Sequence, residues 1–318
     1  YYAYGIESSI HGIQEEWLYE INSRSDKLVF TRQQKNGEYK YQFKTIAEKA
    51  DTKQFVKFIS QGTPVHKSFL SEYFERNGRG LSEISTVYLW FRDNLNIIFP
   101  DTRYRGISVG IDSDDEYKSK MKHLLEYFNT GIIDIRRFKI SEGEVELPRE
   151  IIHSVKSTLN KLTAVTSTDG VNIYIFEKNQ AGEITIYKQK AVHLNNIKEE
   201  VLFAMDEESD GSIRLLDFIP MLIDLSLNPN VYLIDEIDRS MHPMLSRKLL
   251  EYYYSNLSPN LDTQLICTTH EASLLNFSAI RHDEIWFVEK DNDGASHFTS
   301  LAEYKPRQDI QKGYMQGR

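Results

Sequence analysis

The pattern of apolar and polar residues predicts that the chain opens with β-strands and continues with helices. Residues 1–43 hold short runs of aromatic and β-branched residues, and Asn36-Gly37 is a hairpin signal between the last two runs. Residues 45–98 instead carry apolar residues at helical spacing. Their three stripes are Phe55, Phe58 and Ile59; Phe69, Leu70, Tyr73 and Phe74; and Val87, Trp90, Phe91, Leu95 and Ile98.

The middle of the chain is predicted to mix both kinds of element. A helix is expected over residues 112–129, where acidic residues at the start suit the positive end of the helix dipole. Pro148 is a good first-turn residue for a second helix at 149–162. Strands are expected at 132–135, 144–147, 172–176 and 183–187, the last two forming a hairpin.

The C-terminal third alternates helix and strand, which is typical of a parallel sheet. The expected helices cover residues 212–227, 243–255 and, more briefly, 271–276. The expected strands are 231–234, 264–267 and 284–288. The pattern therefore places the chain in the α/β class.

Composition narrows the classes of function that remain. The net charge of −9 argues against a surface that coats nucleic-acid phosphates, although a local basic patch stays open. The single cysteine, Cys267, excludes an intrachain disulfide and suits a reducing cytoplasm. No apolar run approaches the roughly 20 residues that a membrane helix needs, and no signal peptide is recognisable. We therefore expect a cytoplasmic protein without a membrane partner.

Asp235 and Glu236 form the strongest single motif. They follow the apolar run 231–234, and open α/β sheets bind ligands at the carboxyl ends of their strands. Adjacent strand residues point to opposite faces, so one carboxylate can hold a Mg²⁺-bound water while the other contacts an attacking water. Two solvated acids at the start of a loop are the alternative.

Ser209, Gly211 and Arg214 surround the start of the helix predicted at 212–227. A helix N-terminus presents unpaired N–H groups that suit a phosphate. Ser209 adds a hydroxyl, and Gly211 lets the backbone approach closely. Ordinary capping of the helix by Ser209 or Asp210 is the alternative.

His270 follows the strand predicted at 264–267, so it would share a sheet edge with Asp235 and Glu236. There it could donate to a γ-phosphate oxygen, although a structural histidine is the alternative. The loop from Asp238 to Pro243 comes just after the two carboxylates, where another subunit could touch it. Taken together in this order, the motifs indicate one phosphoryl-transfer site.

These motifs resemble the RloA-like branch of the ABC-type ATPases, prokaryotic proteins akin to the OLD-family ATPase heads and linked to anti-phage defence. The resemblance implies an α/β fold, an ABC-type ATPase head with a parallel P-loop-like core, an antiparallel N-terminal β lobe and an inserted helical subdomain. It also implies ATP and Mg²⁺ as cofactors. It extends over nearly the whole chain and rests on residues 16–19, 87–93, 208–211, 233–238, 283–290 and 313–318.

The resemblance implies a role for each motif. Asp235 would orient Mg²⁺, Glu236 would polarise the attacking water, and His270 would be the switch residue. Ser209 and Gly211 would act in trans on the γ-phosphate bound by a partner head. The segment from Ser240 to His242 would be the D-loop equivalent. The residues assigned to cofactor binding are thus Ser209, Gly211, Arg214, Ser240 and His242.

The sequence departs from this family in one respect. It holds no G-x-x-x-x-G-K-[S/T] run, whose N–H groups and Lys would cradle the phosphates. In the family this loop lies near the N-terminus. Either the loop precedes the printed sequence or this protein has lost it, and the strand-like start at Tyr1, without an initiator Met, favours the first. Without it, the chain is expected to bind ATP only weakly, if at all.

We expect the chain to have four parts and at least two protein partners. Two heads would dimerise head-to-tail around ATP, or form a higher homo-oligomer, so that each completes the other's site. The helical insertion would dock an effector, by resemblance a TOPRIM-like or RloB-like nuclease or toxin. The parts are a partial N-terminal β lobe at 1–44, the helical insertion at 45–130, a connecting β/α part at 131–200, and an ABC core at 201–318.

Three alternatives compete with an efficient ATPase in anti-phage defence. An ATP-gated scaffold would hold its effector and hydrolyse ATP very slowly. Only a measured turnover rate separates such a scaffold from an efficient ATPase. A metal-dependent nuclease could use Asp235, Glu236 and Asp238, but two-metal sites need carboxylates from separate elements, and His270 is then unexplained. An SMC-like DNA repair ATPase would need a long heptad insertion, and the sequence has none.

Overall fold

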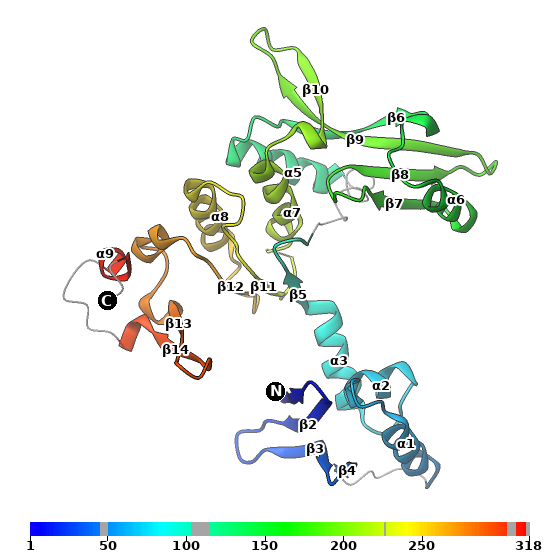
Figure 1. Ribbon diagram of the computed structural model, residues 1–318, viewed down its shortest axis with the longest axis vertical. Helices are drawn as coiled ribbons and strands as arrows, with labels where there is room; N and C mark the ends of the chain where they lie inside the picture. The colour runs from blue at the N-terminus through cyan, green and yellow to red at the C-terminus, as the bar shows by residue number, and fades with distance from the viewer. Residues whose placement is uncertain (45–49, 103–114, 226, 304–309, 316–318) are drawn as a thin grey trace. The chain divides into compact units, whose positions relative to one another are not determined.

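The computed structural model describes residues 1–44, 50–102, 115–225, 227–303 and 310–315 (Figure 1). The chain divides into two compact units, Tyr1–Leu95 and Asn96–Arg318. Each unit combines sheets with helices, so the architecture is mixed α/β. The four parts expected from the sequence stay a prediction, and the second of them, 45–130, spans the boundary between the two units. Residues 112–114 of one expected helix, and 316–318 of the last family-like segment, lie outside the described parts.

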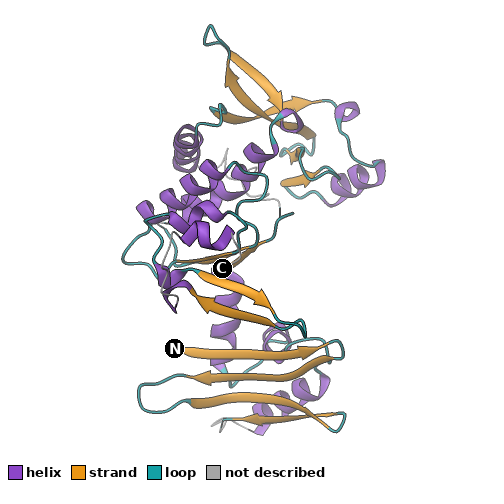
Figure 2. Ribbon diagram, turned by 60° about the vertical axis from the view of Figure 1, so that its left-hand side comes forward, coloured by secondary structure: helices purple, strands orange, loops and turns teal. Residues whose placement is uncertain are grey.

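An antiparallel sheet of four strands, in the order β1-β2-β3-β4, forms the N-terminal part of the first unit (Figure 2). Asn36 and Gly37 have φ values of 56° and 83°, as the two-residue turn between β3 and β4 requires. The β-structure expected over residues 1–43 is thus confirmed. The strands are β1 (Tyr2–Ser9), β2 (Gly12–Glu20), β3 (Lys27–Lys35) and β4 (Glu38–Phe43).

Helices α1 (Ala50–Gly62), α2 (Phe69–Glu75) and α3 (Ser82–Asn94) share one apolar cluster with this sheet. One predicted stripe is wrong, because α1 buries Val56 and Ile59 while Phe55 is 37% and Phe58 is 58% exposed. The helices themselves confirm the helical character of most of residues 50–94.

The third predicted helix is shorter than its apolar stripe indicated. It ends at Asn94, and the next residues form strand β5 (Leu95–Ile98). Asn94 and Asn96 are poor helix formers, and Pro100 disfavours a helical backbone at the residue before it. The stripe therefore combines two elements, and β5 joins a sheet of the second unit.

A buried ion pair organises the first unit. Glu16 and Arg32 are opposite each other in the pairing of β2 with β3, both are 0% exposed, and their charged groups lie 3.6 Å apart. The Glu16 carboxylate accepts hydrogen bonds from the N–H groups of Phe69 and Leu70, at 2.7 and 3.0 Å, and from the Tyr4 hydroxyl at 3.0 Å. Burial and this carboxylate together raise the pKa of Tyr4.

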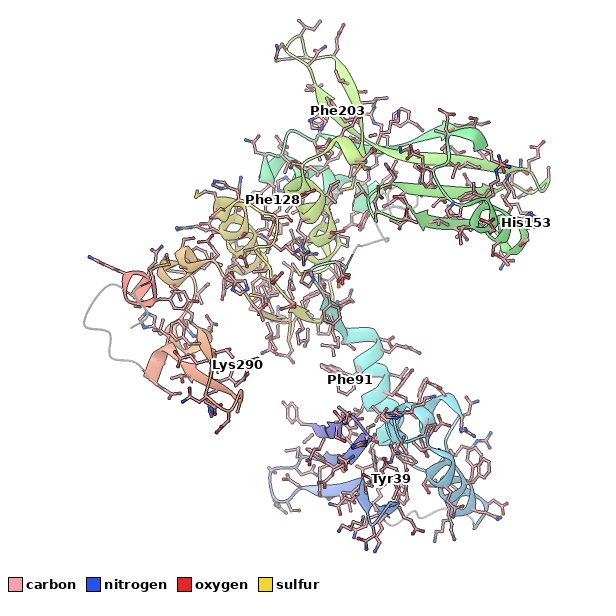
Figure 3. The ribbon with its side chains drawn as sticks, in the orientation of Figure 1. Tyr39, Phe91, Phe128, His153, Phe203 and Lys290 are labelled. Atoms are coloured by element: carbon pink, nitrogen blue, oxygen red, sulfur yellow. The ribbon has the colours of Figure 1, made fainter. Side chains whose placement is uncertain are left out.

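Arg32 fixes the loop that leads into α2. Its guanidinium donates to the carbonyls of Lys67 and Pro64, at 2.7 and 3.0 Å. It also stands over the ring of Tyr39, 3.9 Å from the centroid (Tyr39 is labelled in Figure 3). Because buried charges are tolerated only when other groups compensate them, this pair ties the sheet to the start of α2.

The second unit contains a larger antiparallel sheet in the order β10-β9-β8-β7, with β6 also paired to β9. The hairpin expected near residues 172–187 is confirmed as β8 and β9, whereas β7 and β10 were not predicted. Helix α6 (Arg149–Thr158) packs on this sheet, where its Ile152 shares an apolar cluster with Tyr174 and Phe176 of β8. The strands are β6 (Asp134–Ile140), β7 (Leu162–Thr166), β8 (Ile173–Lys178), β9 (Ile184–Leu194) and β10 (Glu200–Ala204).

The strand predicted at 144–147 is wrong. Residues Glu142–Glu144 form a short 3-10 helix instead. The Glu144 carboxylate accepts hydrogen bonds from the Ser141 N–H at 2.8 Å and from its hydroxyl at 2.7 Å. This local capping outcompetes the extended conformation that the alternating residues indicated.

A three-stranded sheet in the order β12-β11-β5 carries the C-terminal core, and β11 (Val231–Ile234) runs parallel to β12 (Gln264–Cys267). Tyr232 and Ile234 face an apolar cluster shared with α5 (Asp115–Phe128), α7 (Asp210–Asp224) and α8 (Pro243–Asn256). On the opposite face, Leu233 and Ile266 are 36% and 48% exposed. Helices thus cover one face of this parallel pair.

The strand predicted at 284–288 does not extend the parallel sheet. β13 (Trp286–Lys290) instead pairs antiparallel with β14 (Ser296–Ser300), which was not predicted. The short helix expected at 271–276 is a 3-10 helix, Ala272–Asn276. Phe287 stacks on Tyr314 of α9 (Ile310–Met315). In the parts of the chain described above, no helix has the length and apolar character needed to span a membrane.

We expect Glu16→Ala to destabilise the protein by about 3–5 kcal/mol, because it leaves the Arg32 guanidinium buried without its counter-charge. Urea unfolding followed by circular dichroism measures the loss. Glu38→Ala, at an exposed position of the same sheet, is the matched control and should change stability by less than about 0.5 kcal/mol. Equal losses in the two variants would contradict the structural role of the pair.

Candidate functional site

The residues that follow β11 and β12 meet at one end of the parallel pair. The register aligns Ile234 with Cys267, so Asp235 and Thr268 are the first residues beyond the two strands. The Thr268 hydroxyl donates to the Asp235 carboxylate at 2.6 Å. The Asp235 N–H donates to the Ile98 carbonyl of β5 at 2.9 Å. The structure therefore brings together the two segments that the sequence placed at one sheet edge.

Glu236 lies in a turn and does not extend the strand. Its φ is 50°, a left-handed conformation that costs energy for a residue with a side chain. The opposite-face argument for the adjacent carboxylates is therefore wrong, because β11 ends at Ile234. The half-exposed Glu236 carboxylate lies 3.6 Å from the Arg239 guanidinium and 3.7 Å from His270 Nε2. A permanent cation and an imidazole thus flank it.

His270 presents its ring to solvent. The side chain is 82% exposed, and its backbone N–H donates to the Asp238 carboxylate at 3.3 Å. Asp238 thereby joins the segment after β11 to the segment after β12. Among the residues that the structure describes, no three His, Cys, Asp or Glu side chains gather as a metal-binding group, so the nuclease alternative gains no multi-carboxylate site there.

The loop from Ser240 to His242 is held in a defined conformation. Ser240 has a φ of 60°, and the Met241 N–H donates to the Asp238 carbonyl at 3.0 Å. His242 Nδ1 accepts a hydrogen bond from the Met244 N–H at 3.2 Å, so His242 caps α8. His242 was predicted to bind a cofactor, and in the structure its Nδ1 is engaged by the protein's own backbone.

The start of α7 touches this loop. The Ser209 hydroxyl accepts a hydrogen bond from the Ser212 N–H at 3.1 Å and caps the helix, the role that the sequence allowed as an alternative. A Cβ atom on Gly211 would lie 2.9 Å from the Ser240 carbonyl oxygen. Gly211 therefore permits a close approach, and in this chain the approaching group is the Ser240 backbone.

Arg214 is 1% exposed and packs inside the unit. Its guanidinium lies over the Phe218 ring, 4.6 Å from the centroid, and 3.9 Å from the Asp217 carboxylate. It also borders a polar cavity of about 290 Å³ beside the start of α7. Three aspartates and two arginines share its lining, so the cavity offers phosphates no excess of positive charge. Its charged and hydroxyl-bearing lining residues are Asp101, Asp169, Asp210, Arg214, Arg239 and Ser240.

Sequence reasoning gave no ATPase role to Thr268, Asp238 or Arg239, although all three contact the predicted site residues. The sequence places Asp238 in the loop that follows the two carboxylates and, for the nuclease alternative, among the metal-binding carboxylates. Thr268 could have been recognised because it is the first residue after β12, which runs parallel to β11, the strand that precedes Asp235 and Glu236. The contacts of Asp238 and Arg239 depend on loop conformation, which apolar periodicity does not reveal.

Cys267 adds no nucleophile to the site. Burial, with a smaller contribution from Asp238, raises the pKa of its thiol to about 11. The thiol therefore stays protonated at neutral pH, and thiolate chemistry is not available here.

We expect Gly211→Ala to destabilise the protein by about 1–3 kcal/mol, because its Cβ would force the Ser240 carbonyl away from α7. Urea unfolding measures the change. Gly143→Ala is the control, because a Cβ there meets no atom closer than 4.0 Å, and we expect it to be near neutral. A Gly211→Ala protein as stable as the control would show that the loop yields without cost.

A comparison with curated proteins found no match for this chain. A comparison with family models found one described as "AAA domain, putative AbiEii toxin, Type IV TA system", which matches residues 2–276. The matched range contains most of the chain and every candidate site residue from Ser209 to His270. The chain therefore belongs to this family of AAA domains.

Proposed function

We propose that this chain forms most of an ABC-type ATPase head that hydrolyses ATP at the ends of β11 and β12. The observation that carries the proposal is the meeting of Asp235, Glu236 and His270 at one sheet edge in an AAA-family chain. Family membership makes a nucleotide the expected ligand. The RloA-like resemblance supplies the finer assignment to the ABC type.

The arrangement can supply most of the polar groups that phosphoryl transfer needs. Asp235 offers a carboxylate for Mg²⁺, which in proteins keeps several waters and phosphate oxygens besides one or two carboxylates. When bound, Mg²⁺ would neutralise charge on the phosphates. Glu236 can accept a hydrogen bond from an attacking water, and the Arg239 guanidinium lies 3.6 Å from its carboxylate. The exposed His270 ring can donate to a phosphoryl oxygen.

The phosphate cradle has to come from outside these elements. The sequence has no G-x-x-x-x-G-K-[S/T] run, and the cavity beside α7 is rich in carboxylates. The exposed face of the parallel pair, with Leu233 and Ile266, also fits further polypeptide, because parallel sheets are normally covered on both faces. We therefore propose that a segment other than β11, β12 and the start of α7 completes the nucleotide site.

The proposed head acts as a dimer on an effector. Ser209 and Gly211 lie at the N-terminus of the 15-residue helix α7, where the helix dipole would favour a phosphate on a partner head. The family description names a putative toxin of a type IV system, which is compatible with control of an effector protein. Anti-phage defence is the setting that the RloA-like resemblance favours.

The test is ATP turnover by the full-length protein beside Glu236→Gln. We expect the variant to lower kcat by about 100-fold or more, because the amide cannot accept a proton from water. It should still bind ATP, and light scattering should detect a dimer that persists with ATP. Phosphate release measures kcat, and a fluorescent ATP analogue measures binding.

Glu251→Gln, on the surface of α8, is the matched control and should leave turnover unchanged. If Glu236→Gln hydrolyses ATP at the wild-type rate, Glu236 does not polarise the water. If the wild type neither hydrolyses ATP nor dimerises with it, the chain is better described as a structural or interaction module.

A further inference from the structure

We propose that Thr268 is a positioning residue that holds Asp235 and Glu236 in their working arrangement, an inference that rests on the proposed ATPase function. One hydroxyl contacts both residues. It donates to the Asp235 carboxylate at 2.6 Å and accepts from the Glu236 N–H at 2.8 Å.

The direction of both hydrogen bonds is determined by chemistry. An ionised carboxylate can only accept, and a backbone N–H can only donate. The single hydroxyl hydrogen of Thr268 therefore points at Asp235, and a lone pair receives Glu236. A serine can reproduce this pattern, whereas an isosteric valine can make neither bond.

The backbone of Thr268 is held by the same segment. Its N–H donates to the Ile234 carbonyl at 2.9 Å, and its carbonyl accepts from the Ile237 N–H at 3.0 Å. Thr268 thus makes four hydrogen bonds to residues 234–237. Because its main chain is anchored on both sides, its hydroxyl is a fixed reference point for the turn.

The turn needs such a reference because Glu236 is left-handed. A φ of 50° is an uncommon backbone state for a residue with a side chain, and it persists only where surrounding contacts maintain it. The Thr268 hydroxyl provides one of these contacts at the Glu236 N–H. The same hydroxyl restricts rotation of the Asp235 carboxylate, which would hold Mg²⁺.

Thr269 is a natural control for this inference. It is the next residue and the same residue type, yet its hydroxyl accepts a hydrogen bond from the Glu271 N–H at 3.0 Å. No hydrogen bond within the described residues joins the Thr269 side chain to Asp235 or Glu236. A general effect of losing a threonine hydroxyl near the site would therefore appear equally in both variants.

The first measurement is ATP turnover of the full-length protein as a function of Mg²⁺ concentration, for wild type, Thr268→Val, Thr268→Ser and Thr269→Val. We expect Thr268→Val to raise the half-saturating Mg²⁺ concentration and lower kcat, each by about 10-fold or more. The KM for ATP at saturating Mg²⁺ should change little. Thr268→Ser and Thr269→Val should resemble the wild type.

The second measurement is amide hydrogen exchange at Glu236, which requires no turnover. We expect the Glu236 amide to exchange about 10-fold faster in Thr268→Val than in Thr268→Ser, because its acceptor is gone. If exchange responds in this way but no variant hydrolyses ATP, the proposed function fails while the positioning of Glu236 stands. The inference is overturned if Thr268→Val matches Thr269→Val in both measurements, or if Thr268→Ser is as impaired as Thr268→Val.

Discussion

The register between β11 and β12 is the constraint on which the candidate site depends. Because Ile234 pairs with Cys267, the residues after each strand begin at the same level of the sheet. A slip of one residue would turn every side chain of one strand to the other face. Tyr232 and Ile234 resist such a slip, since both are buried against the helices of the second unit. Core packing thereby determines how the candidate site residues beyond the two strands are placed relative to each other.

The Glu16–Arg32 pair and the candidate site hold their charges in different ways. In the first unit, Glu16 and Arg32 are fully buried and bound largely by backbone groups, so they act as structural ties. In the second unit, the Glu236 carboxylate and the His270 ring stay accessible, and their partners lie 3.6 to 3.7 Å away. Loose, solvated pairing leaves these groups able to exchange partners when a ligand arrives.

Local patterns predicted much of the fold, and non-local contacts account for the rest. The Asn36-Gly37 hairpin, β11, β12 and α8 follow from turn chemistry and apolar periodicity within a few residues. By contrast, β5 is recruited from an apparent helix by pairing with β11, and β13 leaves the parallel sheet to pair with β14. No short stretch of sequence carries that information.

The candidate site divides in the same way. The order of the motifs predicted that Asp235, Glu236 and His270 would be neighbours, because strand ends of a parallel sheet share an edge. It did not predict that Gly211 would lie against the Ser240 carbonyl or that Arg214 would be buried. These contacts depend on how α7 packs, which its own apolar stripe does not specify.

The exposed apolar face of the β11–β12 pair bears on how the protein behaves in solution. Unless further polypeptide covers them, Leu233 and Ile266 form an exposed apolar surface beside the edge of β12. Such surfaces cause colloidal association that strengthens with protein concentration and with excluded salts such as sulfate. Self-association in the absence of nucleotide would then reflect contact between these exposed apolar faces. Only the additional assembly that nucleotide induces would reflect dimerisation of the heads.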